Sequence, residues 1–193
     1  MKDTRKKSFA GQGIFPYWWA FTLLIPIRNF FLSPKKLMQR LALRKEWTVL
    51  EVGPGPGYFS VPISRFLTEG KLVLADIQQE MLDYAKKRLQ KKSITNVAYH
   101  LCDGETFAFS DNTFDCIFMV AVLGEVESKK EYLLEFHRIL KNDGVLSISE
   151  LAGDADKMTP DELLGFLQQA GFRQKDFFGN EKTYTVNFAK EVM

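Results

Sequence analysis

The sequence predicts an α/β fold in which a seven-stranded, mostly parallel sheet carries helices on both faces and an antiparallel pair at one edge. Three observations support this prediction. From residue 47 onward, short apolar segments typical of buried strands alternate with longer amphipathic segments typical of helices. Such alternation produces a parallel sheet that is covered on both faces. The chain has 193 residues, 46% of them hydrophobic and 26% charged, so it can bury one substantial core.

The N-terminal part differs from the rest of the chain in charge. Residues 1–47 carry a net charge of +8, and the remaining residues carry a net charge of −6. This asymmetry leaves two interpretations open, an anionic partner for the N-terminal part or a solvated basic terminus. We therefore treat residues 1–46 as a basic, aromatic, helical extension of a domain that spans residues 47–193.

Within this extension, residues 14–27 contain no charged side chain. The segment is shorter than the roughly 20 residues that a membrane-spanning helix requires, and Pro16 and Pro26 bracket it. No small-residue cleavage site of a signal peptide follows. The segment is expected to form a buried or interfacial helix. A second helix is expected next, with Ser33 as its N-cap and Pro34 as its first residue.

The main domain is expected to follow a regular order of strands and helices. Glycines are expected to end the helices, namely Gly70, Gly144 and Gly171, because glycine adopts the left-handed conformation at helix C-termini. Strands are predicted at 48–52, 71–76, 97–102, 114–120, 145–150, 172–179 and 183–192, and helices at 57–70, 78–92, 129–144 and 159–171. The inward face of the second of these helices is predicted to consist of Met81, Leu82, Ala85 and Leu89.

A glycine-rich loop, "EVGPGPG", follows the first predicted strand at residues 51–57. Its spacing does not fit the G-x-G-x-x-G pattern of dinucleotide-binding loops, and no lysine follows as in a phosphate-binding P-loop. Glu51 ends the strand, where a carboxylate would repel a pyrophosphate but attract a cation. Ligands of such sheets bind beyond the carboxyl ends of the strands. The loop therefore indicates a ligand with a positive charge near Glu51.

Four segments in order resemble the class I S-adenosylmethionine-dependent methyltransferases, in particular the small-molecule methyltransferase type 11 branch that includes quinone-biosynthesis enzymes. They are "VLEVGPGPGYFS", "VLAD", "CDGETFAFSDNTFD" and "EFHRILKNDGVLSISE". The resemblance covers about residues 35–190 and implies a Rossmann-like domain that binds S-adenosylmethionine. It also implies transfer of a methyl group by in-line displacement, a reaction that depends more on positioning than on acid–base chemistry.

The resemblance assigns cofactor contacts to individual residues. Glu51 would attract the α-ammonium group, Asp76 would accept hydrogen bonds from the ribose hydroxyls, and Asp103 would accept one from the adenine amino group. Alternatives remain open, because Asp76 is also suited to cap a helix and Asp103 to form a turn. The cofactor-binding residues are expected to be Glu51, Gly53, Gly55, Gly57, Asp76, Ile77, Cys102, Asp103, Gly104 and Ala121.

The residues that would act on the methyl acceptor are less specific. Glu125 follows the fourth strand, where similar enzymes carry His or Asn, and it is the candidate for a base or an acceptor contact; a surface acid is the alternative. His100 and His137 are expected to be structural, and the histidines and cysteines show no metal-ligand spacing. The extension is expected to form an N-terminal helical lid over the substrate, with Tyr17, Trp18, Trp19 and Phe21 against an apolar acceptor or in the core.

These features predict an enzyme that methylates a small, hydrophobic or lipid-like acceptor. Trp and Tyr flanked by basic residues also favour peripheral contact of residues 1–47 with an anionic membrane. Two cysteines without a disulfide pattern favour a cytoplasmic location. The motif of amino-directed nucleic-acid methyltransferases is absent, so nucleic acid is not favoured. A nucleotide-binding oxidoreductase and a non-catalytic protein that binds a cofactor or RNA are the alternatives.

Overall fold

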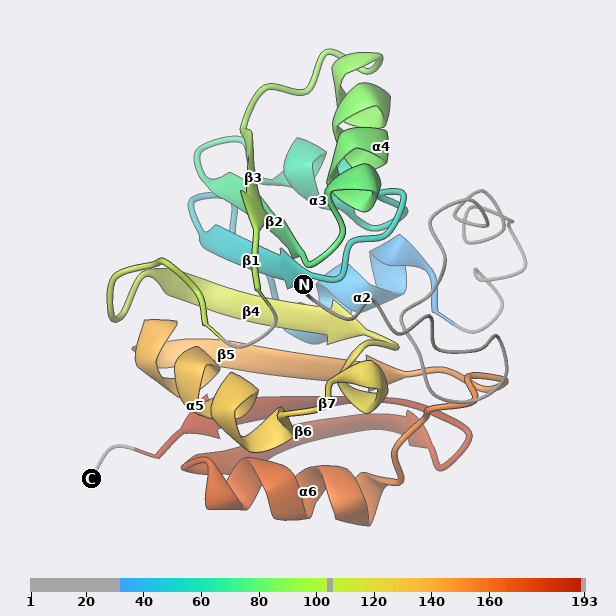
Figure 1. Cartoon of the computed structure of the whole chain (residues 1–193), viewed down its shortest axis with the longest axis vertical. Helices are drawn as coiled ribbons and strands as arrows, with labels where there is room; N and C mark the ends of the chain where they lie inside the picture. Colours follow the sequence, from blue (N-terminus) through green and yellow to red (C-terminus); the bar gives the residue numbers. More distant parts are fainter. Residues whose placement is uncertain (1–31, 104–105, 192–193) are drawn as a thin grey trace, which may run out of the picture.

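The computed structural model describes residues 32–103 and 106–191, and within them seven strands form one sheet in the order β3-β2-β1-β4-β5-β7-β6 (Figure 1). Strands β1 to β5 pair in parallel, whereas β7 is antiparallel to both β5 and β6. The strands are β1 (Thr48–Val52), β2 (Lys71–Asp76), β3 (Val97–Leu101), β4 (Phe114–Val120), β5 (Leu140–Glu150), β6 (Phe172–Asn180) and β7 (Thr183–Lys190).

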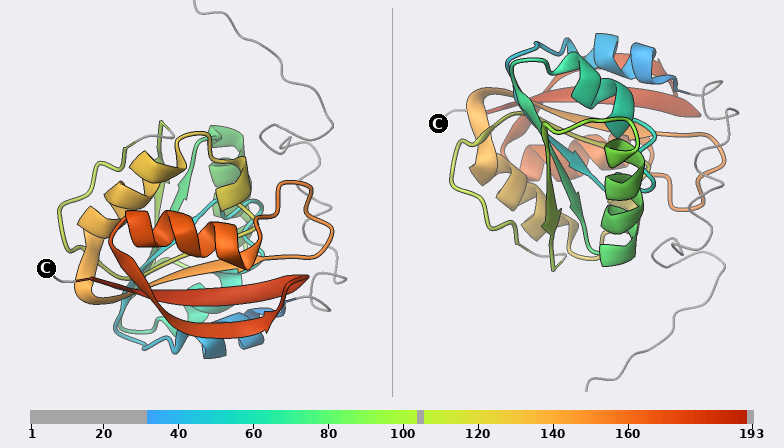
Figure 2. Two further views of the ribbon diagram at one scale, coloured as in Figure 1. Left: turned by 90° about the horizontal axis from the view of Figure 1, so that it is seen from below. Right: turned by 90° about the horizontal axis from the view of Figure 1, so that it is seen from above.

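Two layers of helices enclose the sheet, as Figure 2 shows. Side chains of α2, α3 and α4 share one apolar cluster with Val49 and Leu74 of the sheet. Side chains of α5 and α6 share the other cluster with Leu50 and Ile148. The helices are α2 (Pro34–Leu41), α3 (Ser60–Phe66), α4 (Gln79–Gln90), α5 (Lys129–Ile139) and α6 (Pro160–Gln169), and a 3-10 turn, η2 (Leu123–Glu125), follows β4.

The predicted fold class is confirmed, including the antiparallel pair at one edge. The β2 strand has the predicted bounds, because its apolar run ends at the carboxylate of Asp76. The four predicted inward residues of α4 are buried. Thr159 caps α6 by accepting a hydrogen bond from the Glu162 backbone N–H, and the Glu162 side chain accepts one from the Thr159 backbone.

Two predicted helices are markedly shorter than expected. The helix predicted at 57–70 is regular only from Ser60 to Phe66. The helix predicted to close at Gly144 ends at Ile139, because Leu140 begins β5 and pairs with Phe114 of β4. Gly144 has another role there. A Cβ atom at this position would lie 2.7 Å from Leu140 Cδ1, so the glycine permits close packing rather than ending a helix.

Hydrogen bonds join α2 to the sheet. Ser33 caps the helix as predicted, since its side chain accepts from the Lys36 backbone N–H. The guanidinium of the buried Arg40 donates to Thr185 Oγ1 at 2.7 Å, and the Asn187 side chain donates to the Arg40 carbonyl at 2.7 Å. In the part of the chain that the structure describes, no helix is both long and apolar enough to cross a membrane.

Candidate functional site

The strands β1, β2, β4 and β5 point in the same direction, so the loops that follow them gather at one edge of the sheet (Figure 1). The register places Glu51 of β1 between Leu74 of β2 and Phe118 of β4. At this edge the chain places three acids at the ends of strands, Glu51, Asp76 and Glu150. All three side chains are buried.

The glycine-rich loop adopts a conformation that side chains disfavour. Gly53, Gly55 and Gly57 have φ angles of +64°, +51° and +78°. The backbone N–H of Gly53 donates to the Ala75 carbonyl at 2.9 Å, which continues the contact between β1 and β2. A Cβ atom on Gly53 would lie 2.6 Å from Cγ2 of Val122. The absence of a side chain at Gly53 is therefore required by the residues after β4 as well as by the turn.

An arginine holds the glycine loop from outside. Nη1 of Arg88, on α4, donates to the Gly57 carbonyl at 2.7 Å and to the Pro56 carbonyl at 3.2 Å. Arg88 is not among the predicted site residues, because it lies among several other basic residues of an amphipathic helix. No spacing rule connects such a helix to carbonyl groups about 30 residues earlier in the chain.

Glu51 is 2% exposed, and its Oε2 atom has no hydrogen-bonding partner among the described residues. Burial raises the pKa of its carboxyl to about 8, and the nearby Ser60 hydroxyl offsets a small part of this rise. Because Ser60 Oγ also lacks a partner within standard hydrogen-bond geometry, we attribute the raised pKa of Glu51 to burial. Such a carboxyl is suited to a cationic group that would supply the missing partner.

Asp76 is 8% exposed, and its Oδ1 atom accepts a hydrogen bond from the Gln78 backbone N–H at 2.9 Å. Burial raises the pKa of its carboxyl to about 6, and hydrogen bonds from the backbone of Gln78 and Ile77 lower it in part. Asp76 therefore forms the turn into α4, but the carboxyl does not cap that helix, whose N-cap residue is Gln78.

The segment after β3 lies beside Asp76. The Cys102 backbone N–H donates to the Asp76 carbonyl at 3.0 Å, and the Cys102 side chain is buried. Ile77 is 40% exposed, which leaves an apolar surface next to these residues. The carboxyl of Asp103 accepts hydrogen bonds from both the backbone N–H and the hydroxyl of Thr106. Asp103 thus forms the turn that was the alternative interpretation, and Gly104 lies outside the described residues.

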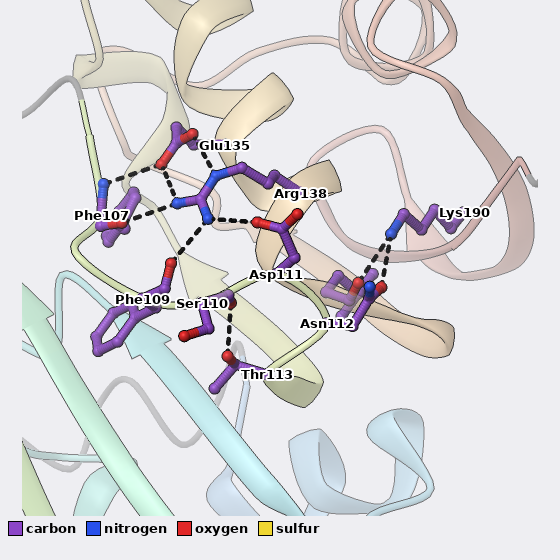
Figure 3. Close-up of polar contacts among 10 residues, drawn as sticks. Phe107, Phe109, Ser110, Asp111, Asn112, Thr113, Glu135, Arg138 and Lys190 are labelled. Atoms are coloured by element: carbon purple, nitrogen blue, oxygen red, sulfur yellow. Dashed lines mark hydrogen bonds and ion pairs between the residues drawn. The ribbon is translucent and has the colours of Figure 1, made fainter.

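Arg138 of α5 holds the chain between β3 and β4 in place (Figure 3). Its guanidinium donates to the carboxyls of Asp111 and Glu135, each at 2.8 Å, and to the carbonyls of Phe107 and Phe109. These partners raise the pKa of Arg138. Nearby, the Thr113 hydroxyl donates to the Ser110 carbonyl, and Lys190 donates to Asn112. This network is structural and fixes the path of the segment that follows Asp103.

The residues after β4 complete the edge. Ala121 has a φ angle of +55°, and its backbone N–H donates to the Ser149 carbonyl at 2.8 Å. Glu125 is half-buried at the end of η2 and interacts electrostatically with Glu150. Among the described residues, no group of three or more His, Cys, Asp or Glu side chains is placed to hold a metal ion. The predicted lid residues Tyr17, Trp18, Trp19 and Phe21 lie outside the described residues.

Glu150 is also not among the predicted site residues. It is 0% exposed, and neither Oε1 nor Oε2 has a hydrogen-bonding partner among the described residues. Burial and the charge of Asp154 raise the pKa of its carboxyl to about 8. The signal that could have found it is the one that singled out Glu51 and Asp76, an acid at the end of a buried strand.

Comparisons with known proteins agree with this architecture. Residues 43–184 match a family described as a methyltransferase domain. The chain is 31% identical over 176 residues to the ubiquinone/menaquinone biosynthesis C-methyltransferase UbiE of Escherichia coli O139:H28, with 70% of each chain covered. The crystal structure of a SAM-dependent methyltransferase from Aquifex aeolicus superimposes with a TM-score of 0.85 and 26% identity, covering 93% of this chain and 100% of that chain.

The fold also occurs with other chemistry. The crystal structure of the [4+2]-cyclase SpnF superimposes with a TM-score of 0.71 and 17% identity, covering 82% of this chain and 79% of that chain. At this level of identity the similarity shows the fold alone. The chemistry therefore depends on the residues at the edge of the sheet rather than on the fold.

We predict that Glu51→Gln makes the ligand-free protein more stable relative to wild type as the pH rises from 5 to 9. The folded carboxyl titrates at about 8 instead of the usual 4.5, so the folded state holds a proton that the unfolded state releases between these values. Wild-type stability therefore falls across this window, by at most about 1.4 kcal/mol per pH unit. The glutamine side chain does not titrate, so the stability of the variant does not fall for this reason.

Urea unfolding at each pH measures this effect, with Glu69→Gln, a change at an exposed acid, as the control. A stability difference between Glu51→Gln and wild type that is the same at pH 5 and pH 9 would contradict the assignment.

Proposed function

The chain belongs to the class I S-adenosylmethionine-dependent methyltransferases, and we propose that it methylates a small, hydrophobic or lipid-like acceptor with a quinone-type ring. The observation that carries this proposal is the similarity to UbiE, which covers 70% of each chain. UbiE is named as a C-methyltransferase of ubiquinone and menaquinone biosynthesis. The acceptor would be the reduced ring, because its hydroxyl groups make the ring carbons nucleophilic.

The glycine loop and Glu51 suit the amino-acid end of the cofactor. S-adenosylmethionine supplies a methyl group on a sulfonium centre, and its methionine part carries an ammonium and a carboxylate. We assign the ammonium to Glu51, because the unpartnered Oε2 atom is buried at the edge where the loop begins. Gly53 and Gly55 would let the loop backbone approach this part of the ligand, because their positive φ angles form a turn that side chains disfavour. Binding would then release the proton that the buried carboxyl holds in the free protein.

Asp76 suits the ribose, and its neighbours suit the adenine. One carboxyl oxygen already accepts from the Gln78 backbone N–H, which orients the group at the end of β2. Ile77, half exposed, and the buried Cys102 would form apolar walls for the base. Asp103 would offer a carboxylate oxygen to the adenine amino group from the turn that it forms with Thr106. Gly57 and Ala121 would contribute backbone positions around the same ligand.

Glu125 is proposed to contact the acceptor. It ends η2, the turn that follows β4, and Val122 of the same connection lies close to Gly53 of the glycine loop. Positioning of the acceptor against the methyl group provides most of the rate in such displacements. The lid residues of the extension, which lie outside the described residues, would add apolar contacts.

We predict that Asp76→Ala weakens the binding of S-adenosylhomocysteine by about 10- to 100-fold, because a charged carboxylate that accepts ribose hydrogen bonds contributes roughly 1.5–3 kcal/mol. Isothermal titration calorimetry measures the affinity, and Asp83→Ala, a change at an exposed acid of α4, is the matched control. Equal affinity of Asp76→Ala and wild type would remove the ribose assignment. Tight binding of NAD with no response to S-adenosylhomocysteine would favour the oxidoreductase alternative.

We predict that the protein transfers a methyl group from S-adenosylmethionine to a reduced naphthoquinol that carries a short prenyl chain and one unsubstituted ring position. Mass spectrometry of the product measures the transfer, and the same quinol with a methyl group already at that position is the control. Binding of S-adenosylhomocysteine without any methylation of the quinol would contradict this acceptor class and leave the cofactor assignment intact.

We also propose that residues 1–47 make peripheral contact with anionic membranes, on the basis of their net charge of +8. Each Lys or Arg near such a surface contributes about 1 kcal/mol. We therefore predict that replacing Arg5, Lys6 and Lys7 together with Gln weakens sedimentation with phosphatidylglycerol vesicles by more than tenfold. Replacement of Lys91 and Lys92, exposed at the end of α4, is the control. Equal sedimentation with phosphatidylcholine vesicles would contradict an electrostatic contact.

A further inference from the structure

Glu150 is the buried acid that the assigned cofactor contacts do not use. It ends β5, and its side chain is fully covered, yet both carboxyl oxygens lack a hydrogen-bonding partner among residues 32–103 and 106–191. A buried carboxyl without partners is costly, so it persists in folded proteins when it has another role. The position of Glu150 in the sheet indicates what that role is.

Glu150 and Glu51 end two strands that flank β4. Side chains alternate between the faces of a sheet, and Glu51 shares its face with Val49 whereas Glu150 shares the opposite face with Ile148. Two strand spacings separate the two backbones by roughly 10 Å. The tip of β4 lies between them, because the Ala121 backbone N–H donates to the Ser149 carbonyl. With the methionine end of the cofactor at Glu51, Glu150 lies across β4 from it, on the face of the sheet that α5 and α6 cover.

Charged groups from every adjoining segment face Glu150, but the cations among them have other partners. Nζ of Lys129 donates to the carbonyls of Gly124 and Val126, and Nζ of Lys157 donates to the carbonyls of Glu181 and Lys182. Neither lysine forms an ion pair with Glu150 in this structure, so neither offsets the burial of the carboxyl through a direct contact. The titratable and charged groups around it are Glu125 of η2, Lys129 of α5, Asp154 and Lys157 of the loop after β5, and Tyr184 of β7, beyond which lies Glu162 of α6.

A cavity of about 500 Å³ opens beside this group of charges. Its lining includes Lys129 and Lys157, the two cations that interact with Glu150, and Gly124 of the turn after β4. Met158 and Phe166 give it apolar surface. Glu150 itself does not line this cavity, and a small ring that entered it would contact the two lysines that interact with Glu150. The loop 151–159 would have to shift to uncover the carboxyl, and this loop has no regular secondary structure.

We propose that Glu150 is the general base that takes the proton from a ring hydroxyl of the acceptor. This inference rests on the proposed function. The O–H bond breaks, its electron pair stays on the hydroxyl oxygen, and its proton goes to the Glu150 carboxylate. The ring carbon next to the hydroxyl then forms a bond to the methyl carbon, and the C–S bond breaks with its electron pair on sulfur. Loss of the proton on that ring carbon to water restores the aromatic ring as a phenolate, and the phenolate oxygen takes back the proton from Glu150, so one proton is released per methyl group transferred.

The environment of Glu150 suits this step. A base is most effective when its pKa lies near the working pH and close to that of the group it deprotonates. Burial and Asp154 raise the pKa of Glu150 to about 8, toward the range of a phenolic hydroxyl. An exposed glutamate would be a much weaker base. Below pH 8 the carboxyl is protonated and inactive as a base, so the methylation rate is expected to rise with pH.

The test uses the full chain with the prenyl naphthoquinol, and compares wild type with Glu150→Gln, Glu150→Asp and Asp154→Asn. We expect Glu150→Gln to lower kcat about 100-fold or more, to change KM by less than threefold, and to leave the affinity for S-adenosylhomocysteine unchanged. Wild-type kcat should rise between pH 6.5 and 9, and this rise should vanish in Glu150→Gln. Glu150→Asp should recover part of the rate. Asp154→Asn should move the rise to lower pH, because it removes a negative charge that disfavours ionisation of Glu150.

The outcomes separate this inference from the function on which it rests. If wild type methylates the quinol and Glu150→Gln has the same kcat and the same pH profile, Glu150 is not the base, and the acceptor class stands. If wild type does not methylate the quinol, the acceptor class is wrong and the inference falls with it. A readout without acceptor is the urea stability of Glu150→Gln, which should rise relative to wild type between pH 5 and 9. If the stability difference stays constant over that range, burial does not raise the pKa of Glu150, and the inference is overturned.

Discussion

The register of β1 against its two neighbours is the constraint on which the candidate site depends. Glu51 pairs with Leu74 on one side and with Phe118 on the other, so the last residues of β1, β2 and β4 end at one level. A shift of one residue would turn Glu51 to the opposite face of the sheet and move Gly53 away from Val122. The glycine loop, the acid at its start and the tip of β4 are thus fixed together by backbone pairing, before any side chain of the site makes a contact.

The same edge concentrates buried carboxyls that have few partners. Glu51 and Asp76 lie on the face of α3 and α4, and Glu150 lies on the face of α5 and α6. Burial is the main cause that raises the pKa of each, and the charge of Asp154 adds to the rise at Glu150. In the ligand-free protein such groups cost stability, and this is a common cost of sites that are prepared for charged or proton-donating ligands. The core below them is mostly apolar, and the buried Arg40, Thr185 and Asn187 within it are joined by hydrogen bonds.

The sequence was sufficient for the order of strands because their apolar runs are short and end at polar residues or glycines. It was less reliable for helix ends, since Gly144 is required by contact with Leu140 and not by a helix terminus. In the site, Glu51 and Asp76 could be predicted because an acid after a buried strand is a local pattern. Glu150 shows the same pattern but matched no expected contact. Arg88 could not be predicted, because its role depends on how α4 packs against a distant loop.

The contact of Arg88 with the glycine loop also determines which way the loop's peptide groups face. In a trans peptide the carbonyl and the following N–H point in opposite directions, and the described residues contain no cis peptide. The carbonyl of Gly57 points to the guanidinium, so the N–H of Tyr58 points away from α4. The guanidinium of Arg88 lies behind the loop, so the N–H donor of Tyr58 lies on the other side of the loop. By polarising the peptide group, the guanidinium strengthens that donor. In this way α4, which is not part of the glycine loop, determines the direction in which a peptide group of that loop points.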